Sequence, residues 1–126
     1  MSGYSLDANI LIDALLDHPP AHAEIRRIAN TGALMWISRI AWIEALSKGD
    51  EGLVAQASRF LSRFGMDELD EAVAGRAAAL RRQRPRLRSP DAIILASALI
   101  HGRTLVTRNT KDFPAAMPGI RVPYVI

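Results

Sequence analysis

In the stretch Tyr4-Ser5-Leu6-Asp7-Ala8-Asn9-Ile10-Leu11-Ile12, a single carboxylate separates two largely apolar runs. The first run has the composition of a buried strand and the second that of a helix. A charge at such a junction needs a partner, because burying an ionised group without one is costly. Asp91 is placed in a similar way, since it follows Ser89-Pro90 and precedes the apolar run 92–96. Carboxylates in these positions commonly converge on a cation.

Two further acids lie in or beside apolar segments. Glu44 shares a predicted helix face with Ile40 and Ile43, and Asp112 directly precedes Phe113. Simpler roles also fit these acids: an arginine partner for Glu44, a turn position for Asp112 and, for Asp91, a favourable site in the first turn of a helix. Asp7 is the hardest of the four to explain by structure alone.

Length and composition limit the possible classes of protein. The chain has 126 residues, of which 49% are apolar, so we expect one domain spanning residues 1–126 with a real core. The absence of cysteine excludes disulfides and cysteine-type zinc sites, which leaves oxygen or histidine ligands for any metal. The N-terminal residues resemble no signal peptide, and the longest apolar stretch, 92–100, is too short to span a bilayer. We therefore expect a soluble cytoplasmic protein without membrane attachment.

Charge is distributed unevenly along the chain. Residues 1–75 carry six Lys/Arg and eleven Asp/Glu, whereas residues 76–126 carry ten and two, which gives −5 against +8. Five arginines fall within eight residues just before Asp91: Arg81, Arg82, Arg84, Arg86 and Arg88. Such a cluster favours a polyanion held by its phosphates, although any one arginine could instead complement the end of a helix dipole.

The pattern of apolar residues and turn signals predicts alternating strands and helices. The predicted strands are 4–6, 34–37, 104–107 and 120–122, and the predicted helices are 8–16, 21–29, 39–47, 51–64, 70–83 and 91–100. Pro19-Pro20 is predicted to stop the first helix, and Ser38 and Ser89 are predicted N-caps. Short apolar strands spaced by helices indicate a parallel sheet covered on both faces, with its ligand site at the carboxyl ends of the strands.

Four segments together carry a resemblance to a known family. They are Leu6-Asp7-Ala8-Asn9-Ile10-Leu11-Ile12-Asp13, Ile43-Glu44-Ala45-Leu46, Ser89-Pro90-Asp91-Ala92-Ile93-Ile94-Leu95-Ala96 and Leu105-Val106-Thr107-Arg108-Asn109-Thr110-Lys111-Asp112-Phe113. In this order and spacing the chain resembles the PIN-domain nucleases, and it is most similar to the VapC toxins of bacterial toxin–antitoxin pairs.

The resemblance implies an α/β fold, a three-layer α/β/α sandwich with a short central parallel sheet. It also implies a ribonuclease that depends on Mg²⁺ or Mn²⁺, an RNA substrate, a cognate antitoxin and a homodimer. Asp7, Glu44 and Asp91 match the family's three core acids. Some members carry an aspartate where this chain has Asn109, so Asp112 is the nearest candidate for the fourth acid.

The remaining predicted site residues support these acids. Asn9 and Thr107 match positions that orient the acids, and Asn109 belongs with them. Oxygen ligands suit Mg²⁺, which would activate a water for in-line attack on a phosphodiester and leave a 5′-phosphate and a 3′-hydroxyl. Candidate RNA-binding residues are Arg82, Arg84, Arg86, Arg108 and Lys111.

Other classes explain less of the sequence. A Mg²⁺-binding phosphoacceptor signalling domain would have the same fold class, but it normally places two adjacent acids after the first strand, where this chain has Asp7-Ala8. A haloacid-dehalogenase-like phosphatase would need Asp-x-Asp, and no glycine-rich dinucleotide motif follows the first strand. A PIN-like domain that binds RNA or protein without cleaving stays open as an alternative.

Overall fold

The computed structural model describes residues 3–125 and contains a five-stranded, entirely parallel sheet. The strands are β1 (Tyr4–Leu6), β2 (Met35–Ser38), β3 (Gly65–Asp67), β4 (Thr104–Val106) and β5 (Ile120–Arg121), in the spatial order β3-β2-β1-β4-β5. The α-helices are α1 (Ala8–Leu15), α2 (Pro19–Asn30), α3 (Arg39–Leu46), α4 (Val54–Leu61), α5 (Glu71–Gln83) and α6 (Ser89–Ile100), with a 3₁₀ turn η1 (Glu51–Leu53) before α4.

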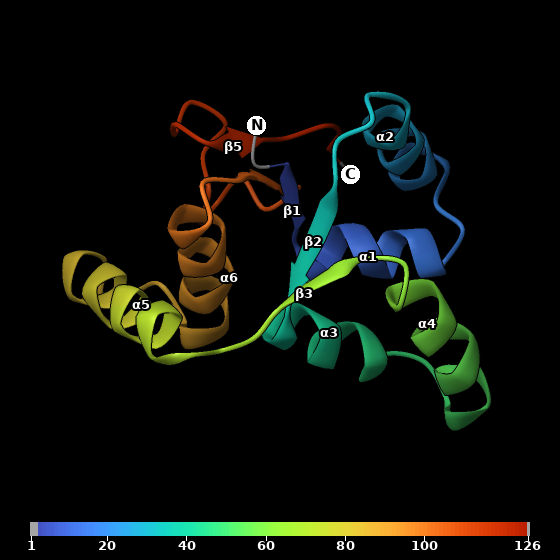
Figure 1. The fold of residues 1–126 in the computed structure, drawn as a ribbon, viewed down its shortest axis with the longest axis horizontal. Helices are drawn as coiled ribbons and strands as arrows, with labels where there is room; N and C mark the ends of the chain where they lie inside the picture. The colour runs from blue at the N-terminus through green and yellow to red at the C-terminus, as the bar shows by residue number, and fades with distance from the viewer. Residues whose placement is uncertain (1–2, 126) are drawn as a thin grey trace.

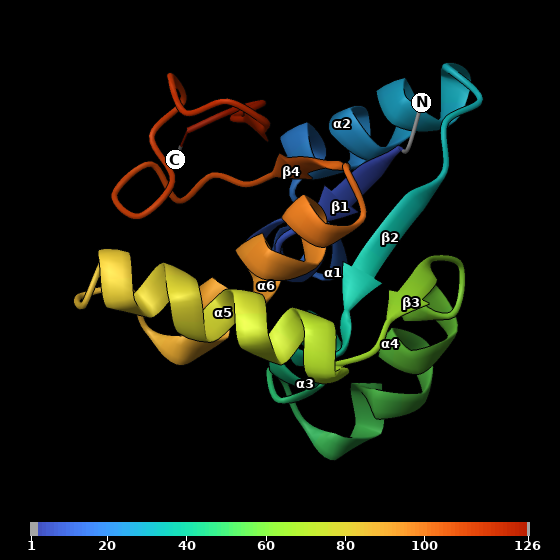
Figure 2. The same ribbon diagram turned by 60° about the vertical axis from the view of Figure 1, so that its left-hand side comes forward.

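Helices cover both faces of the sheet, so the predicted three-layer α/β/α class is confirmed (Figure 1). On one side α6 packs directly on β1, β2 and β4, and α5 packs on the outer face of α6 (Figure 2). On the other side lie α1, α2 and α4. The helix α3 begins directly after β2, at the carboxyl end of the sheet, and contacts both α1 and α6. It therefore bridges the two helical layers beside the strand ends.

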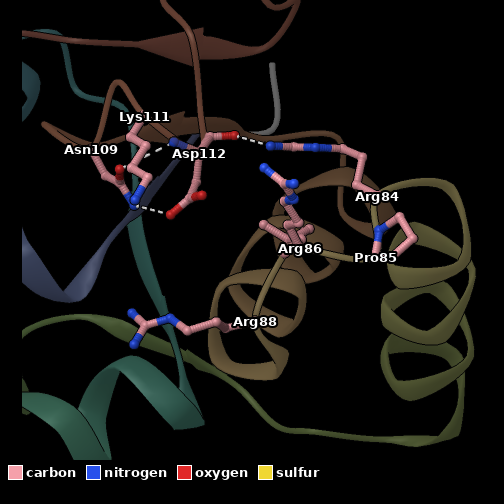
Figure 3. Close-up of a pocket in the computed structure, with 8 residues that line it drawn as sticks. Arg84, Pro85, Arg86, Arg88, Asn109, Lys111 and Asp112 are labelled. Atoms are coloured by element: carbon pink, nitrogen blue, oxygen red, sulfur yellow. Dashed lines mark hydrogen bonds between the residues drawn. The ribbon is translucent and has the colours of Figure 1, made fainter.

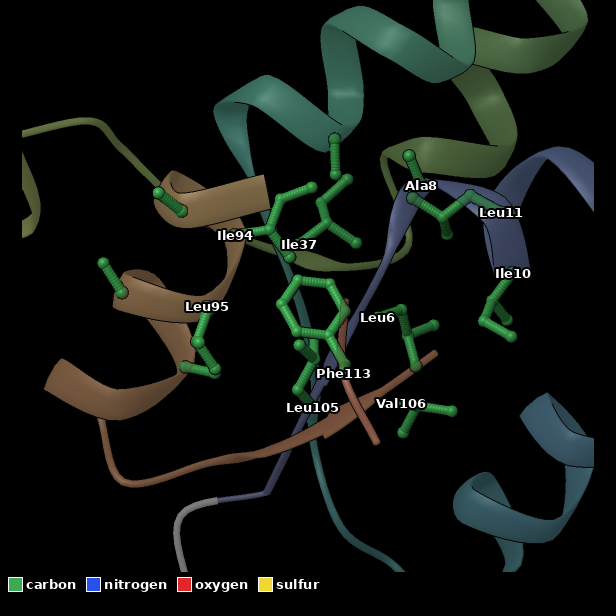
Figure 4. Packing of buried hydrophobic residues seen from close by; sticks show 14 of the residues in the cluster. Leu6, Ala8, Ile10, Leu11, Ile37, Ile94, Leu95, Leu105, Val106 and Phe113 are labelled. Atoms are coloured by element: carbon green, nitrogen blue, oxygen red, sulfur yellow. The ribbon is translucent and has the colours of Figure 1, made fainter. Parts of the chain in front are cut away.

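The core forms where the central strands meet α1 and α6. Leu6, Ile37 and Leu105 come from β1, β2 and β4 and are almost completely buried. Phe113, in the loop that follows β4, is fully buried in the same cluster (Figure 4). An aromatic ring buries more apolar area than an aliphatic side chain. Phe113 also fixes the end of the loop that leaves β4.

The edge strand β3 was not predicted. Its three residues have weak strand composition, and the sequence pattern assigned Gly65 to the end of a helix. The strand forms because it pairs with β2 over Trp36–Ser38, a contact between distant parts of the chain. Glycine is required here, since a Cβ on Gly65 would lie 2.3 Å from a ring carbon of Trp36.

Three helices differ from the prediction by more than one residue at a boundary. Pro19 and Pro20 begin α2 instead of stopping a helix, because proline lacks only an N–H that the first turn leaves unpaired. The predicted helix 51–64 is divided into η1 and the shorter α4. The last helix begins at Ser89, with Arg88 at the N-cap position and no side-chain cap.

Ser38 caps α3 as predicted, since its hydroxyl accepts a hydrogen bond from the Ala41 N–H. Between residues 3 and 125, no helix combines the length and the apolar character that crossing a bilayer requires.

Candidate functional site

Asp7 lies at the junction of β1 and α1, where its carboxylate is held by several donors. Its Oδ1 accepts a hydrogen bond from the Ala8 N–H at 2.7 Å. Its Oδ2 accepts one from the Thr107 hydroxyl at 2.7 Å and a longer one from the Asn9 amide at 3.3 Å. The Asn9 amide also donates to the Thr107 oxygen, so these two side chains hold each other and Asp7. Asn9 and Thr107 thus contact the acid that the sequence assigned to them.

The ionised form of Asp7 is disfavoured in the folded chain. Its side chain is almost fully buried, and this burial raises its pKa from 3.8 to about 6. The hydrogen bonds from Thr107 and Ala8 lower the pKa, but the negative charges of Asp91 and Glu44 raise it again. A nearby cation therefore stabilises the ionised form of this buried carboxylate more than it would stabilise that of an exposed one.

Glu44 is half-buried on α3, with its Oε1 shielded from solvent and without a hydrogen-bond partner. The predicted buried face with Ile40 and Ile43 is wrong, because Ile43 is 46% exposed and the buried residues of α3 are Ala41 and Ala45. Burial raises the pKa of Glu44, as does the charge of Asp91. The charges of Arg88 and Lys48 lower the pKa, but neither side chain forms an ion pair with Glu44 in the described part of the chain.

Asp91 lies in the first turn of α6 and is 7% exposed. Burial raises its pKa; Arg88 opposes this shift, and the charge of Asp112 adds to it. The Arg88 Nε is 3.5 Å from the Asp91 Oδ2, which is an ion-pair distance, but this oxygen has no hydrogen-bond partner within the described chain. The Oδ2 of Asp91 is therefore a second buried carboxylate oxygen without a donor.

Asn109 and Asp112 are paired within the loop that follows β4. The Asn109 amide donates to the Asp112 Oδ2 at 3.0 Å, and the Asp112 N–H donates to the Asn109 Oδ1 at 3.2 Å (Figure 3). The Asn109 N–H donates to the Thr107 hydroxyl oxygen, which joins this loop to Asp7. Asn109 thus orients Asp112, and it is the charge of Asp112 that acts on Asp91.

The four acids form one electrostatic group, because the charge on one raises the pKa of its neighbour. Within residues 3–125, no three acidic or histidine side chains are grouped as closely as the ligands of a preformed metal centre. The donor set nevertheless fits a hard divalent cation, since it offers carboxylate oxygens, two of them buried without a donor. Mg²⁺ usually retains several waters, and these can bridge to carboxylates that stand apart.

A basic groove of about 970 Å³ lies next to the acids. Its lining residues are Arg84, Pro85, Arg86, Leu87, Arg88, Asn109, Lys111 and Asp112. Figure 3 shows Arg84 and Arg86 on the side of Asp112, whereas Arg88 extends away from them. Arg84 also has a structural contact, because its Nη2 donates to the Asp112 carbonyl oxygen. The groove is thus lined both by positive side chains and by Asp112, one of the four acids.

Two predicted RNA-binding residues lie outside this groove. Arg82 is exposed in the last turn of α5. Arg108 is engaged by Asp13, with its Nε 2.6 Å from the Asp13 Oδ2. Their contacts with RNA stay predictions.

Sequence reasoning passed over two residues beside the site. Arg88 was counted only as part of the arginine cluster, although its spacing of three residues from Asp91 on a helix start indicates contact. Asp13, like Glu44, is a charged residue within an apolar stretch of a predicted helix, here 10–15. This pattern could have identified Asp13 as a candidate.

Comparisons with known proteins agree with this architecture. A family model described as the PIN domain matches residues 4–116. A chain of a toxin–antitoxin complex from Klebsiella pneumoniae is 37% identical, with a TM-score of 0.86 over 98% of this chain and 100% of that chain. DNA-bound VapBC from Salmonella typhimurium is 28% identical, with a TM-score of 0.76 over 96% of each chain.

A third solved structure supports the fold alone. VapBC2 from Rickettsia felis, bound to a DNA fragment from its promoter, is 24% identical, with a TM-score of 0.73 over 93% of this chain and 94% of that chain. No match was found among curated proteins.

Proposed function

The chain belongs to the PIN-domain family, and on that premise we propose that it is a metal-dependent endoribonuclease, the VapC-type toxin of a toxin–antitoxin pair. The observation that carries the proposal is that four acids from distant segments lie near enough for the charge on one to raise the pKa of another. Asp7, Glu44, Asp91 and Asp112 come from the end of β1, from α3, from the start of α6 and from the loop after β4. Two of their buried oxygens have no donor within the described chain.

These four acids are the residues that would hold Mg²⁺ or Mn²⁺. When bound, a divalent ion supplies positive charge for the scissile phosphate and lowers the pKa of the attacking water. Thr107 and Asn9 keep the Asp7 carboxylate in one orientation through their hydrogen bonds. Second contacts of this kind commonly change metal affinity or activity by roughly 10- to 100-fold when they are lost.

Glu44 and the basic groove have different roles in the proposed reaction. The Oε1 of Glu44 is free to accept a hydrogen bond, so Glu44 can orient the attacking water and accept its proton. Arg86 and Lys111 line the groove and offset the repulsion between the acids and an RNA backbone. In-line hydrolysis would leave a 5′-phosphate and a 3′-hydroxyl.

The proposal includes a cognate antitoxin, as in the Klebsiella and Salmonella complexes. An apolar groove between α1, α3 and α4 offers a docking surface for it. Its lining residues are Ile12, Leu15, Leu16, Ala45, Lys48, Gly49, Leu53, Gln56 and Ala57. Leu16 and Leu53 are 74% and 51% exposed, which is unusual for side chains of this size. A homodimer also belongs to this proposal, on the basis of the family resemblance.

The function is tested by RNA cleavage with and without divalent metal. We expect Asp7→Asn and Asp91→Asn to abolish Mg²⁺- or Mn²⁺-dependent cleavage while leaving the far-ultraviolet circular dichroism unchanged, because each removes a ligand but not a packing contact. Asp50→Asn is the matched control, since Asp50 is exposed and remote from the groove. Full cleavage by either site variant would overturn the assignment, and cleavage in the presence of a chelator would overturn metal dependence.

A further inference from the structure

Asp13 is a buried acid that the proposed chemistry does not use. It is 5% exposed on α1, one helical turn beyond Asn9. Both carboxylate oxygens are occupied: Oδ2 accepts from the Arg108 Nε at 2.6 Å and from the Tyr124 hydroxyl at 2.8 Å, and Oδ1 accepts from the Arg108 Nη2 at 3.2 Å. A two-pronged pair of this kind fixes the plane of the guanidinium group.

Arg108 connects Asp13 to the acidic site through its backbone. The Arg108 N–H donates to the Asn9 Oδ1 at 3.3 Å, and the Asn9 amide in turn donates to the Asp7 Oδ2. Arg108 also stands between Thr107, which donates to Asp7, and Asn109, which holds Asp112. Arg108 therefore links Asp13, bound to its guanidinium group, with Asn9 and Asp7, bound through its backbone N–H, and the loop to Asp112 starts at the same residue.

The loop has a second fixed point at its other end. Phe113 is fully buried, and its N–H donates to the Asn109 carbonyl at 3.1 Å. The segment 107–113 is thus held by Arg108 near its start and by Phe113 at its end. Asp112 lies between these anchors, so the position of its carboxylate depends on both.

We propose that Asp13 is a positioning residue: through Arg108 it holds the segment 107–113 in the arrangement that presents Thr107, Asn109 and Asp112 to Asp7 and Asp91. This inference rests on the proposed nuclease function for its consequences in catalysis. It also reassigns Arg108, because a guanidinium group engaged by Asp13 orients the loop and is not a freely mobile RNA contact.

The chain offers a matched control for a purely structural role. Glu24 on α2 is 4% exposed and is paired with two arginines, Arg27 and Arg121. Like Asp13, it is a buried acid that joins a helix to the C-terminal part of the chain. It makes no side-chain contact with the segment 107–113 among the hydrogen bonds of residues 3–125. Its partner Arg121 meets that segment through the backbone, where the Arg121 carbonyl accepts the Thr107 N–H, and Glu24→Gln leaves this sheet contact in place. Glu24→Gln should therefore lower stability as Asp13→Asn does, without disturbing the acidic site.

The experiment compares Asp13→Asn with Glu24→Gln at a temperature at which circular dichroism shows both to be folded. We expect Asp13→Asn to lower kcat by roughly 10- to 100-fold and to weaken Mn²⁺ binding in calorimetry by a similar factor, with little change in RNA affinity. Amide hydrogen exchange should become faster in the segment 107–113. Glu24→Gln should leave all three quantities within about twofold of wild type.

A second variant keeps the test decisive if Asp13→Asn does not fold. Arg108→Lys retains the positive charge but loses the planar fork that binds both oxygens of Asp13. A positioning role predicts a lower kcat with KM nearly unchanged, whereas a charge contact with RNA predicts nearly wild-type kinetics. The inference is overturned if wild type cleaves RNA and the folded variants keep its kcat, Mn²⁺ affinity and loop exchange. Failure of wild type to cleave RNA would instead overturn the proposed function. In that case, faster amide exchange in the segment 107–113 of Asp13→Asn, but not of Glu24→Gln, would still support the positioning contact.

Discussion

Asp7 is held in place by hydrogen bonds although its negative charge is unfavourable where it lies. Its pKa in the folded chain is about 6, against 3.8 for an ordinary aspartate, and burial is the main cause. Between these two values the folded chain binds a proton that the unfolded chain has released. The free energy of unfolding therefore falls as pH rises from about 4 to about 6, and the loss is fully present above that range.

The variant Asp7→Asn removes this penalty. Without divalent metal at pH 8, we expect it to be more stable than wild type by up to about 3 kcal/mol, since the 2.2-unit difference corresponds to about 1.36 kcal/mol per unit. Urea unfolding at pH 8 and at pH 4 measures the effect, which should disappear at the lower pH. Asp50→Asn should change stability little at either pH. A variant less stable than wild type at pH 8 would show that Asp7 has a structural role instead.

Some residues of the site could be predicted because their signal is local. Asp7 between a strand and a helix, and Asp91 after Ser89-Pro90, are visible in the sequence itself. The contacts of Asp13 could not be assigned, because Arg108 and Tyr124 lie 95 and 111 residues further along the chain. The pairing of Asn109 with Asp112 likewise depends on side-chain orientation in a loop. Local pattern therefore indicated the acids, and the family resemblance indicated Asn9 and Thr107 as their supports, whereas neither showed the contacts of Asp13.

At the scale of elements, strand β3 shows why composition alone was insufficient. Its residues Gly65-Met66-Asp67 have low strand propensity, and the strand exists through pairing with β2 and through the ring of Trp36 lying over Gly65. The Arg103 guanidinium group stacks on the same ring at 4.0 Å and pairs with Asp67 at the end of β3. A tertiary arrangement of this kind cannot be read from a three-residue pattern.

Two glycine substitutions test this account of β3. Gly65→Ala should lower the free energy of unfolding by about 1–3 kcal/mol, because the new methyl group would overlap the Trp36 ring. Gly75→Ala, in the exposed interior of α5, should raise it by up to about 1 kcal/mol, since the methyl group meets no atom within 4 Å there. Equal effects of the two substitutions in urea unfolding would contradict the role of Gly65.

The connection between α5 and α6 gives a second prediction at this scale. Arg86 and Lys111 are exposed and line the groove beside the acids. Replacing both with alanine should lower RNA affinity and reduce the slope of log affinity against log salt by about 1.4, at about 0.7 per lost phosphate contact on a single strand. Fluorescence anisotropy with labelled RNA measures the slope. Arg59→Ala with Arg76→Ala is the control, because both arginines are exposed outside the groove. An unchanged slope in the variant that lacks Arg86 and Lys111 would show that the arginine cluster complements the end of a helix dipole and does not bind RNA.

At the scale of the whole molecule, the two candidate surfaces are separate. The basic groove is formed by the α5–α6 connection and the loop after β4, whereas the apolar groove lies between α1, α3 and α4. The helix α3 contains Glu44, one of the four acids, and also contributes Ala45 to the apolar groove. A partner in the apolar groove would therefore contact the helix that holds one of the acids.

This arrangement leads to a prediction for the cell. Expression of the chain alone should arrest growth of its host, Asp7→Asn should abolish the arrest, and co-expression of the proposed cognate antitoxin should restore growth. Leu16→Asp with Leu53→Asp should keep RNA cleavage but lose this rescue, because charges in the apolar groove disfavour docking. Leu34→Asp is the control, since Leu34 is equally exposed outside that groove. Rescue of the groove variant would exclude this docking surface, and harmless expression of a protein that cleaves RNA when purified would exclude the toxin role while leaving the nuclease in place.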